Sequence, residues 1–422
     1  MAAVSFWMGE TESETRAPQG DAAIHAVIAA CVLENPILAL INNFAFTLNA
    51  QIVAGVQLLI TLAAIAVIAW RRPEISRTFA VTTCLFLAAV LVKFIVSGSF
   101  NPRFVYDAAM LPLFLVLGAS ARRFSPRFFA VILIALLVTA VVELVFPDFY
   151  ADLFNPRKYF YYTRDWVAAV TAPDASIAIS SDIYLGSNRY TGSFFGFSHR
   201  AGSLFLEPLS VGYFGIIGAI FATHAPELSL RQRAGLIACC LMLALLSDTR
   251  VAVFLILAAV LLRRLAGRVQ LRWLFAVPYS VLMIVILLYF LVQAMPGDLG
   301  LRLGVTAKPL LEASPLTILL GGVDDSAVAD SGFVYLIANA GLFGFCLYPL
   351  FASGLLCGAE RPSPVSVSIL LYLMVALAFG YAPMSIKTAS MLGYGVATLT
   401  RPRQERVWGT AITDIPPLAR NA

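Results

Sequence analysis

The chain has 422 residues, of which 60% are hydrophobic and only 13% are charged. Soluble domains are about half apolar and about one quarter charged, so this composition excludes a soluble globular protein and predicts an all-α, polytopic integral membrane protein. The formal net charge of +5 does not indicate a nucleic-acid partner, because in a membrane protein the placement of Lys and Arg in the loops reflects orientation.

The N-terminal tail, residues 1–22, is polar and acidic from Glu10 to Asp21. It lacks a basic segment followed by a short apolar core, so we expect no cleaved signal peptide. The cysteines lie in or beside apolar runs, where cysteine behaves as a small hydrophobe, and no Cys/His spacing is typical of a metal site. We therefore expect no disulfide framework, no metal and no cofactor. The six cysteines are Cys31, Cys84, Cys239, Cys240, Cys346 and Cys357.

A membrane-spanning helix needs about 20 mostly apolar residues, and this rule predicts about twelve spans. They lie near residues 24–48, 50–70, 78–98, 103–120, 126–146, 203–223, 234–248, 250–265, 271–294, 331–357, 364–381 and 384–400. The segments 234–248 and 250–265 are either two helices joined by a hairpin or one broken helix. A break in mid-membrane would bury Asp248 and Arg250 in lipid, so we favour the hairpin.

Orientation follows from the Lys and Arg residues in short loops, which gather on the cytoplasmic side. With residues 1–22 inside, every short cytoplasmic segment is rich in Arg and the short opposite loops are almost bare of positive charge. We therefore predict a single transmembrane domain, 23–400, with both termini cytoplasmic and a C-terminal tail at 401–422. The basic segments contain Arg71, Arg72, Arg77, Arg122, Arg123, Arg127, Arg231, Arg233, Arg263, Arg264, Arg268, Arg272, Arg361, Arg401, Arg403 and Arg406.

Two long segments, 147–202 and 295–330, then lie on the periplasmic side. Loops of this length are uncommon unless they have a function or structure of their own. We expect both to contain short helices at the membrane surface.

A group of charged residues precedes and begins the span at 203–223. Arg189, His199 and Arg200 lead into Glu207–Pro208, and guanidinium groups suit phosphate because they make paired, permanently charged hydrogen bonds. The alternative is that the arginines bind lipid phosphates or pair with Glu207. Glu207 is either an acid/base or hydroxyl-binding group, or the salt-bridge partner of Arg200. Pro208 either kinks the first turns of this helix or follows a partly unwound start.

Further candidates lie at the same face. Arg250, after Ser247-Asp248-Thr249, is either a second phosphate ligand or a residue that extends to the membrane surface and pairs with Asp248. Asp330, before the span at 331–357, is either a helix N-cap or a chemical group. Asp324 and Asp325 are expected in solvent. Three residues near outer ends of spans are expected to extend to the membrane surface, with a cavity-lining role as the alternative: Lys93, Glu143 and Lys387.

An ordered set of features over about residues 180–360 resembles the bacterial O-antigen polymerase and O-antigen ligase superfamily. Arg189-Tyr190-Thr191-Gly192-Ser193-Phe194 precedes Arg200 and Phe205-Leu206-Glu207-Pro208, and Thr249-Arg250 begins a later span. Asp330-Ser331, Tyr335 and Asn339-Ala340-Gly341-Leu342-Phe343-Gly344 follow.

The resemblance implies a membrane-embedded, metal-independent glycosyltransferase of the C type. Its partners would be glycans linked to undecaprenyl diphosphate, the lipid bilayer, a chain-length regulator and a flippase. It implies that Arg189, Arg200 and Arg250 hold the diphosphate and that Arg200, Glu207, Asp330 and His199 are the catalytic candidates.

The same resemblance favours a polysaccharide polymerase acting on O-antigen, capsule or exopolysaccharide. Ligases of this superfamily typically have a histidine just before the late span, where this chain reads Asp330-Ser331. An O-antigen ligase is the first alternative. An exporter or flippase for lipid-linked sugars is the second; it would have charged residues near mid-bilayer, broken helices and an internal repeat.

Overall fold

The computed structural model describes residues 21–164, 167, 194–266, 270–292, 298–323, 331–355 and 363–400. Every regular element in these ranges is a helix. The all-helical fold class predicted from composition is therefore confirmed for the described part of the chain.

The first five helices follow one another through short connections. Their boundaries have local causes: Asn49, Ser76, Asn101 and Ser125 each precede a helix and accept a hydrogen bond from the backbone N–H three residues later. Such capping satisfies amides that have no partner within the helix. The helices are α2 (Ala22–Phe44), α3 (Ala50–Arg71), α4 (Arg77–Ser97), α5 (Pro102–Ala119) and α6 (Pro126–Val145).

Both long loops contain short helices, as predicted. The first holds α7 (Pro147–Phe154) and α8 (Pro156–Thr163), and the second holds α15 (Asp298–Glu312) and α16 (Pro315–Leu320). α7 and α8 pack on the last third of α2 and form a small apolar core separate from the main one. That core includes Leu38, Ala39, Leu48, Tyr150, Phe154, Tyr159, Phe160, Val167 and Leu206.

The two predicted spans at 234–248 and 250–265 form a hairpin of two helices. α11 (Leu230–Leu246) and α12 (Arg250–Ala266) are separate helices joined by a tight turn, in which Asp248 has a positive φ of 47°. The alternative of one broken helix is wrong.

The helix after the charged group begins at Pro208. α10 (Pro208–His224) is preceded by a single 3-10 turn, η2 (Ser203–Phe205), and by Leu206 in the left-handed conformation. The partly unwound start is therefore correct and the kinked helix is wrong. Proline fits the first helical position because its missing N–H would have no partner there.

The remaining helices complete the bundle. α17 is interrupted at Gly341 (φ 65°, ψ 178°), where a Cβ atom would come 2.4 Å from the carbonyl oxygen of Leu319. Its N-cap is Ser331, whose Oγ accepts the N–H of Val334, so the expected cap at Asp330 is wrong; Asp330 lies outside the described residues. These helices are α13 (Leu271–Leu274), α14 (Val277–Val292), α17 (Gly332–Ala352), α18 (Pro364–Ala378), η3 (Ala382–Met384) and α19 (Ile386–Leu399).

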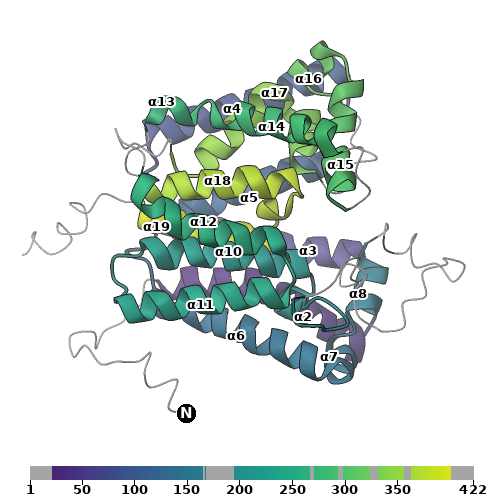
Figure 1. Ribbon diagram of the computed structural model, residues 1–422, viewed down its shortest axis with the longest axis vertical. Coiled ribbons are helices and arrows are strands. Elements are labelled where there is room, and N and C mark those ends of the chain that lie inside the picture. Colours follow the sequence, from purple (N-terminus) through teal and green to yellow (C-terminus); the bar gives the residue numbers. More distant parts are fainter. Residues whose placement is uncertain are drawn as a thin grey trace, which may run out of the picture.

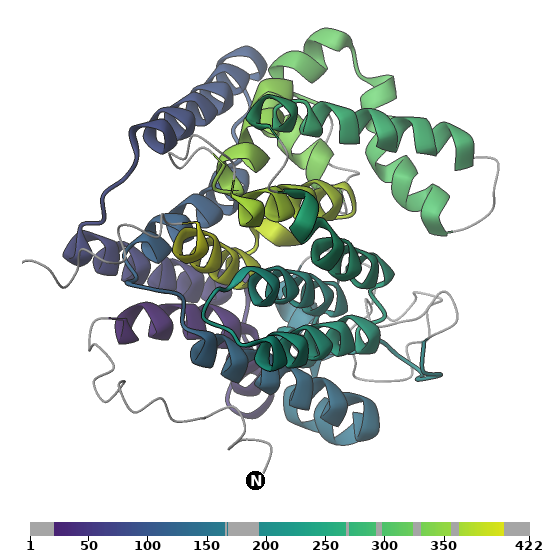
Figure 2. The same ribbon diagram turned by 60° about the vertical axis from the view of Figure 1, so that its left-hand side comes forward.

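α10 is the central helix of the bundle. It packs against α11, α12, α18 and α19, and Figures 1 and 2 show it enclosed among them. Gly212, Gly215 and Gly218 face Thr249, Cys240 and Phe129 so closely that a Cβ atom at any of them would clash. Small residues of this kind let helices approach closely inside a membrane.

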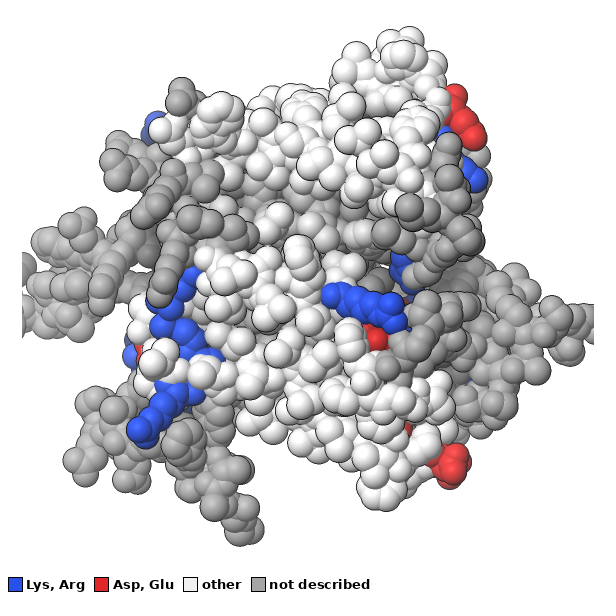
Figure 3. All heavy atoms as spheres, viewed as in Figure 1, with Lys and Arg blue, Asp and Glu red and all other residues white. Residues whose placement is uncertain are grey.

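Six helices are long and apolar enough to cross a membrane: α2, α3, α4, α5, α6 and α17. The other six predicted spans coincide with shorter helices of 14 to 17 residues: α10, α11, α12, α14, α18 and α19. The described part of the chain thus supports a membrane-embedded helical protein with six candidate spans, and the count of twelve stays a prediction. Figure 3 shows a broad band of uncharged side chains between charged groups at the two ends of the helices.

The helix ends lie on two sides of the bundle, as predicted from the alternation of arginine-rich and arginine-poor connections. Polar contacts join helix ends on each side. At one end, here called the arginine end, Asp21 lies 3.8 Å from Arg71 and accepts the backbone N–H of Arg122. At the opposite end, here called the loop end, Asn43 at the close of α2 donates to the carbonyl of Asp152 in α7 at 2.7 Å. The periplasmic position of the loop end remains an inference from the charge rule.

Candidate functional site

Glu207 is the centre of a charged cluster at the start of α10. Arg164 Nη1 lies 2.5 Å from Glu207 Oε1, Lys387 Nζ forms a close ion pair with Oε2, and Ser210 Oγ donates to Oε2 at 3.0 Å. We call Arg164, Glu207 and Lys387 the charge triad. The expected salt bridge between Glu207 and Arg200 is therefore wrong, because both carboxylate oxygens of Glu207 are bound by other cations.

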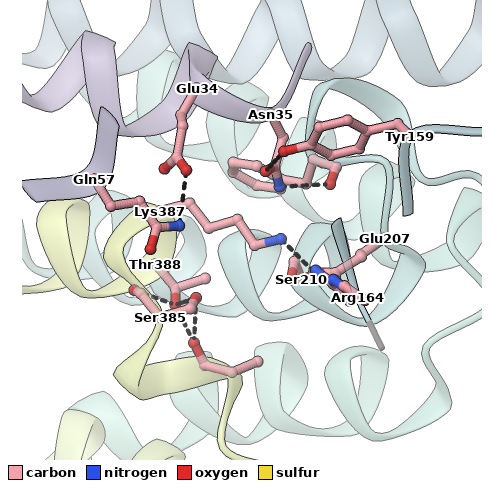
Figure 4. Close-up of polar contacts among 12 residues, drawn as sticks. Glu34, Asn35, Gln57, Tyr159, Arg164, Glu207, Ser210, Ser385, Lys387 and Thr388 are labelled. Atoms are coloured by element: carbon pink, nitrogen blue, oxygen red, sulfur yellow. Dashed lines mark hydrogen bonds and ion pairs between the residues drawn. The ribbon is translucent and has the colours of Figure 1, made fainter. Parts of the chain in front are cut away.

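Three distant segments build the triad (Figure 4). Glu207 ends the unwound segment before α10, Arg164 follows α8, and Lys387 is the second residue of α19. Neighbouring rings hold the two cations in place: the Arg164 guanidinium lies 4.1 Å from the Phe160 ring centroid and Lys387 Nζ lies 5.7 Å from that of Phe205. Lys387 is only 8% exposed, so its expected extension to the membrane surface is wrong.

α2 contributes a polar pair beside the triad. Asn35 donates to the carbonyl of Phe205 and accepts from the Tyr159 hydroxyl, each at 3.3 Å, and thereby joins α2, η2 and α8. Burial raises the pKa of the Tyr159 phenol, which keeps it a hydrogen-bond donor. Glu34 is 4% exposed and accepts from Gln57 of α3 at 2.7 Å.

The depth of this site follows from helix lengths. At 1.5 Å per residue, Glu207 lies about 26 Å along α10 from its arginine end, and Glu34 and Lys387 each lie about 18 Å along α2 and α19. The hydrocarbon core is about 30 Å thick. The cluster therefore lies in the half of the bundle nearer the loop end, just below the level at which Leu38 packs on α7 and α8.

Arg200 and Arg250 lie at the turn beside the start of α10. Arg200 Nε donates to the Ser247 carbonyl at 3.0 Å and its Nη2 to Thr249 Oγ1 at 3.5 Å, while Thr249 contacts the carbonyl of Pro208. Arg250 begins α12, is exposed, and lies 6.0 Å from the Phe194 ring centroid. The two arginines and Glu207 thus surround the N-terminal turn of α10, as the sequence suggested.

His199 lies beside Glu143 rather than in the charge triad. Its Nε2 lies 3.8 Å from Glu143, a fully buried residue whose two oxygens accept the backbone N–H groups of Gly202 and Ser203. Glu143 therefore holds the unwound segment in place. It does not extend to the membrane surface, so the expectation for Glu143 is wrong. Lys93 is buried as a whole, but its Nζ donates to the carbonyl and the hydroxyl of Ser99 in the exposed connection after α4, in agreement with the expected extension.

A second polar group joins α5 to α17. The Tyr335 hydroxyl donates to Asp107 at 3.0 Å, Arg103 lies 3.9 Å from the same carboxylate, and the Tyr335 and Tyr381 rings are 5.3 Å apart. Tyr381 lies within electrostatic range of both Arg164 and Asp107. This group therefore adjoins the triad.

The sequence reasoning identified Arg200, Glu207 and Arg250, and it missed the roles of Arg164 and Glu34. A charged residue inside an apolar run is a signal for function, and Glu34 in the first span had that signal. The remaining candidates, Arg189 and Asp330, and the loop residues Asp324 and Asp325 lie outside the described residues.

Among the residues that the structure describes, no three His, Cys, Asp or Glu side chains are placed to hold a metal ion. Comparisons with protein-family models, curated proteins and solved structures find no match to this chain. Its function must therefore be inferred from the site itself.

Two arginines lie beside the first turn of α10. Arg164 and Lys387 are bound by Glu207, whereas Arg200 and Arg250 lie at the adjoining turn between α11 and α12. Glu207 does not cap the helix with its side chain, and helix N-terminal amides themselves attract phosphate groups. The arrangement can bind a phosphate or diphosphate at the loop end.

Proposed function

We propose that this protein is a polysaccharide polymerase that works at the periplasmic face of the bacterial inner membrane. It transfers a growing glycan from undecaprenyl diphosphate to a lipid-linked repeat unit. The observation that supports this proposal is the placement of two arginines, Arg200 and Arg250, beside the N-terminus of α10 at the loop end. A lipid-linked diphosphate needs permanent positive charge close to the membrane surface, and Arg200 and Arg250 supply it in the fork-like form that suits phosphate oxygens.

In the proposed reaction, a hydroxyl of the acceptor repeat attacks the anomeric carbon of the donor glycan. The bond between that carbon and the diphosphate oxygen breaks, and undecaprenyl diphosphate leaves with the electron pair. Arg200 and Arg250 bind the diphosphate and stabilise the charge that develops on it, an effect that is often the largest in such catalysis. The charge triad holds the start of α10 in place beside them.

The structure changes the roles that the resemblance implied for two residues. Glu207 binds two cations, so its oxygens are already engaged; we assign it to organising Arg164 and Lys387 rather than to proton transfer. His199 faces Glu143 under the loop, which gives it a structural role. Arg189 and Asp330 remain proposals from the resemblance alone.

An exporter of lipid-linked sugars is a second candidate. The observation in its favour is Glu34, a buried carboxylate within a membrane helix, together with the unwound segment before α10 and the interrupted helix α17. The exporter and the polymerase differ in where repeat units accumulate when the protein is lost.

Complementation tests the role of the arginines. In cells that lack the gene, we expect wild-type protein to restore long polymer and Arg250→Ala, produced at the same level in the membrane, to restore less than a tenth of it. Lys308→Ala is the matched control, because Lys308 is an exposed cation at the loop end on α15, which packs against α14 and α17 instead. Full polymer from Arg250→Ala, or equal loss in both variants, would contradict the assignment.

A further inference from the structure

We propose that Glu34 accepts the proton of the attacking hydroxyl, an inference that rests on the polymerase function proposed above. The reaction releases one proton as the new C–O bond forms at the anomeric carbon. The leaving diphosphate takes the electron pair of the broken bond, and a carboxylate at the site takes the proton and later returns it to water. One of the carboxylates near the loop end must therefore have an oxygen that a hydroxyl can reach.

Two of the five buried or half-buried carboxylates that the structure describes near the loop end have both oxygens engaged. Glu207 binds Arg164 through one oxygen and Lys387 through the other. Glu143 accepts one backbone N–H at each of its oxygens. Neither has a place for a sugar hydroxyl without the loss of an existing contact.

Asp107, Asp248 and Glu34 remain. Asp248 lies in the turn between α11 and α12, and its Oδ1 is fully buried, so a sugar hydroxyl does not reach that oxygen. Asp107 accepts the Tyr335 hydroxyl and lies near the guanidinium of Arg103, which stabilises its negative charge. Glu34 has one partner, the neutral amide of Gln57, at its Oε1. Its second oxygen, Oε2, makes no hydrogen bond within the described residues. This oxygen is also not fully buried. Glu34 is therefore a carboxylate whose hydrogen-bond partner is a neutral amide and whose second oxygen is neither hydrogen-bonded to a described residue nor fully buried.

The position of Glu34 also fits the role. Lys387 and Arg164 are the cations that act on it electrostatically, so it lies beside the triad. Figure 4 shows Glu34 and Gln57 facing one another next to Lys387. The half-buried Tyr106 is within electrostatic range and contacts Thr61 at 3.4 Å, which extends a polar surface across α2, α3 and α5. A sugar bears several hydroxyls, and such a surface can bind them.

The structural alternative is that Glu34 and Gln57 only hold α2 to α3. Two substitutions separate these roles. Glu34→Gln keeps a hydrogen-bonding side chain of the same size but cannot accept the proton. Gln57→Leu removes the hydrogen bond between the helices but leaves the carboxylate.

The test uses purified full-length protein in lipid vesicles and the lipid-linked repeat units extracted from cells that lack the gene. We expect Glu34→Gln to lower kcat by about 100-fold or more, a usual effect of losing a general base, with KM changed less than about threefold. Gln57→Leu should keep at least about a third of the wild-type kcat. The decline in wild-type rate at low pH, where Glu34 becomes protonated, should be absent from the residual activity of Glu34→Gln. Added formate or azide should restore part of the rate to Glu34→Ala.

Equal rates for wild type and Glu34→Gln, or equal losses in Glu34→Gln and Gln57→Leu without rescue by formate or azide, would overturn the assignment of Glu34. So would a loss confined to Asp107→Asn, which would make Asp107 the proton acceptor. If the wild-type protein itself formed no polymer from these repeat units, the proposed function would fail and this inference with it.

Discussion

Glu207 shows how a charged residue can be accommodated next to the hydrocarbon core. Charged side chains are costly there and occur mainly where they pair or line a functional cavity. Glu207 is bound by Arg164 and Lys387, and both cations also lie against aromatic rings. The cations are thus held at the start of α10 by a carboxylate that itself has little capacity left for chemistry.

A variant that lacks only the carboxylate of the charge triad should be less stable than a variant that lacks this carboxylate and one of the two cations. Glu207→Gln leaves Arg164 and Lys387 close together without their carboxylate, and removal of one member of a buried ion pair costs about 3–5 kcal/mol in comparable sites. We therefore expect the Tm of Glu207→Gln in detergent to fall well below that of the wild type. The double variant Lys387→Met with Glu207→Gln should recover part of this loss, because Arg164 no longer faces a second buried cation. A single variant as stable as the double variant would contradict this account of the triad.

The contacts of Arg164, Glu207 and Lys387 could not be predicted from the sequence for one physical reason. The triad joins residues 164, 207 and 387, and pairing over such separations depends on how the helices pack rather than on any local pattern. Lys387 was expected to extend to the membrane surface because it stands near the end of an apolar run, a position from which long side chains usually can do so. Its burial against Phe205 and Glu207 is a property of the assembled bundle.

At the scale of elements, the unwound segment before α10 positions the site. Ser203, Leu206 and Asp248 have positive φ angles of 48°, 59° and 47° although none is glycine. Such backbone conformations are costly and persist where surrounding contacts enforce them. Glu143 enforces the first of these through the N–H groups of Gly202 and Ser203, and the Tyr150 hydroxyl adds a hydrogen bond to the Ser203 carbonyl at 2.6 Å.

The contact of α10 with α12 can be tested at Gly212. A Cβ atom there would lie 2.4 Å from the Cβ of Thr249, the residue that links the Arg200 turn to Pro208. We expect Gly212→Ala to lower the Tm and to lower polymer formation, because α12 and its arginine must move away. Gly55→Ala is the matched control: Gly55 lies in α3 with no atom within 4 Å of the added methyl group, so alanine should be neutral or should stabilise the helix by up to about 1 kcal/mol. Equal behaviour of the two variants would contradict the close packing described for α10.

Elements were more predictable than the site because their signals are local. The apolar runs, the Ser and Asn caps and the hairpin at Ser247–Thr249 all lie within a few residues of the feature they determine. The start of α10 was left open between two alternatives because Pro208 is compatible with either. For Asp330 the sequence leaves open a helix cap and a chemical group, and the cap of α17 is the next residue, Ser331. Asp and Ser are both good capping residues, so the local sequence does not decide between them.

At the scale of the whole molecule, the helix ends form two chemically different faces. The short connections at the arginine end contain its basic residues, whereas the loop end contains the added helices α7, α8, α15 and α16 and the candidate site. α10 connects the two faces at the centre of the bundle. This arrangement suits an enzyme whose lipid-linked substrates approach from the membrane and react at one surface.

The lipid-linked glycans of cells that lack this gene provide the most direct test of the polymerase proposal. We predict that single repeat units accumulate on the lipid carrier, that an enzyme added to the periplasmic side can reach them, and that no polymer forms. Full-length polymer retained on the lipid would instead identify a ligase. Single repeat units that cannot be reached from the periplasm would contradict the account, because the protein would then be an exporter.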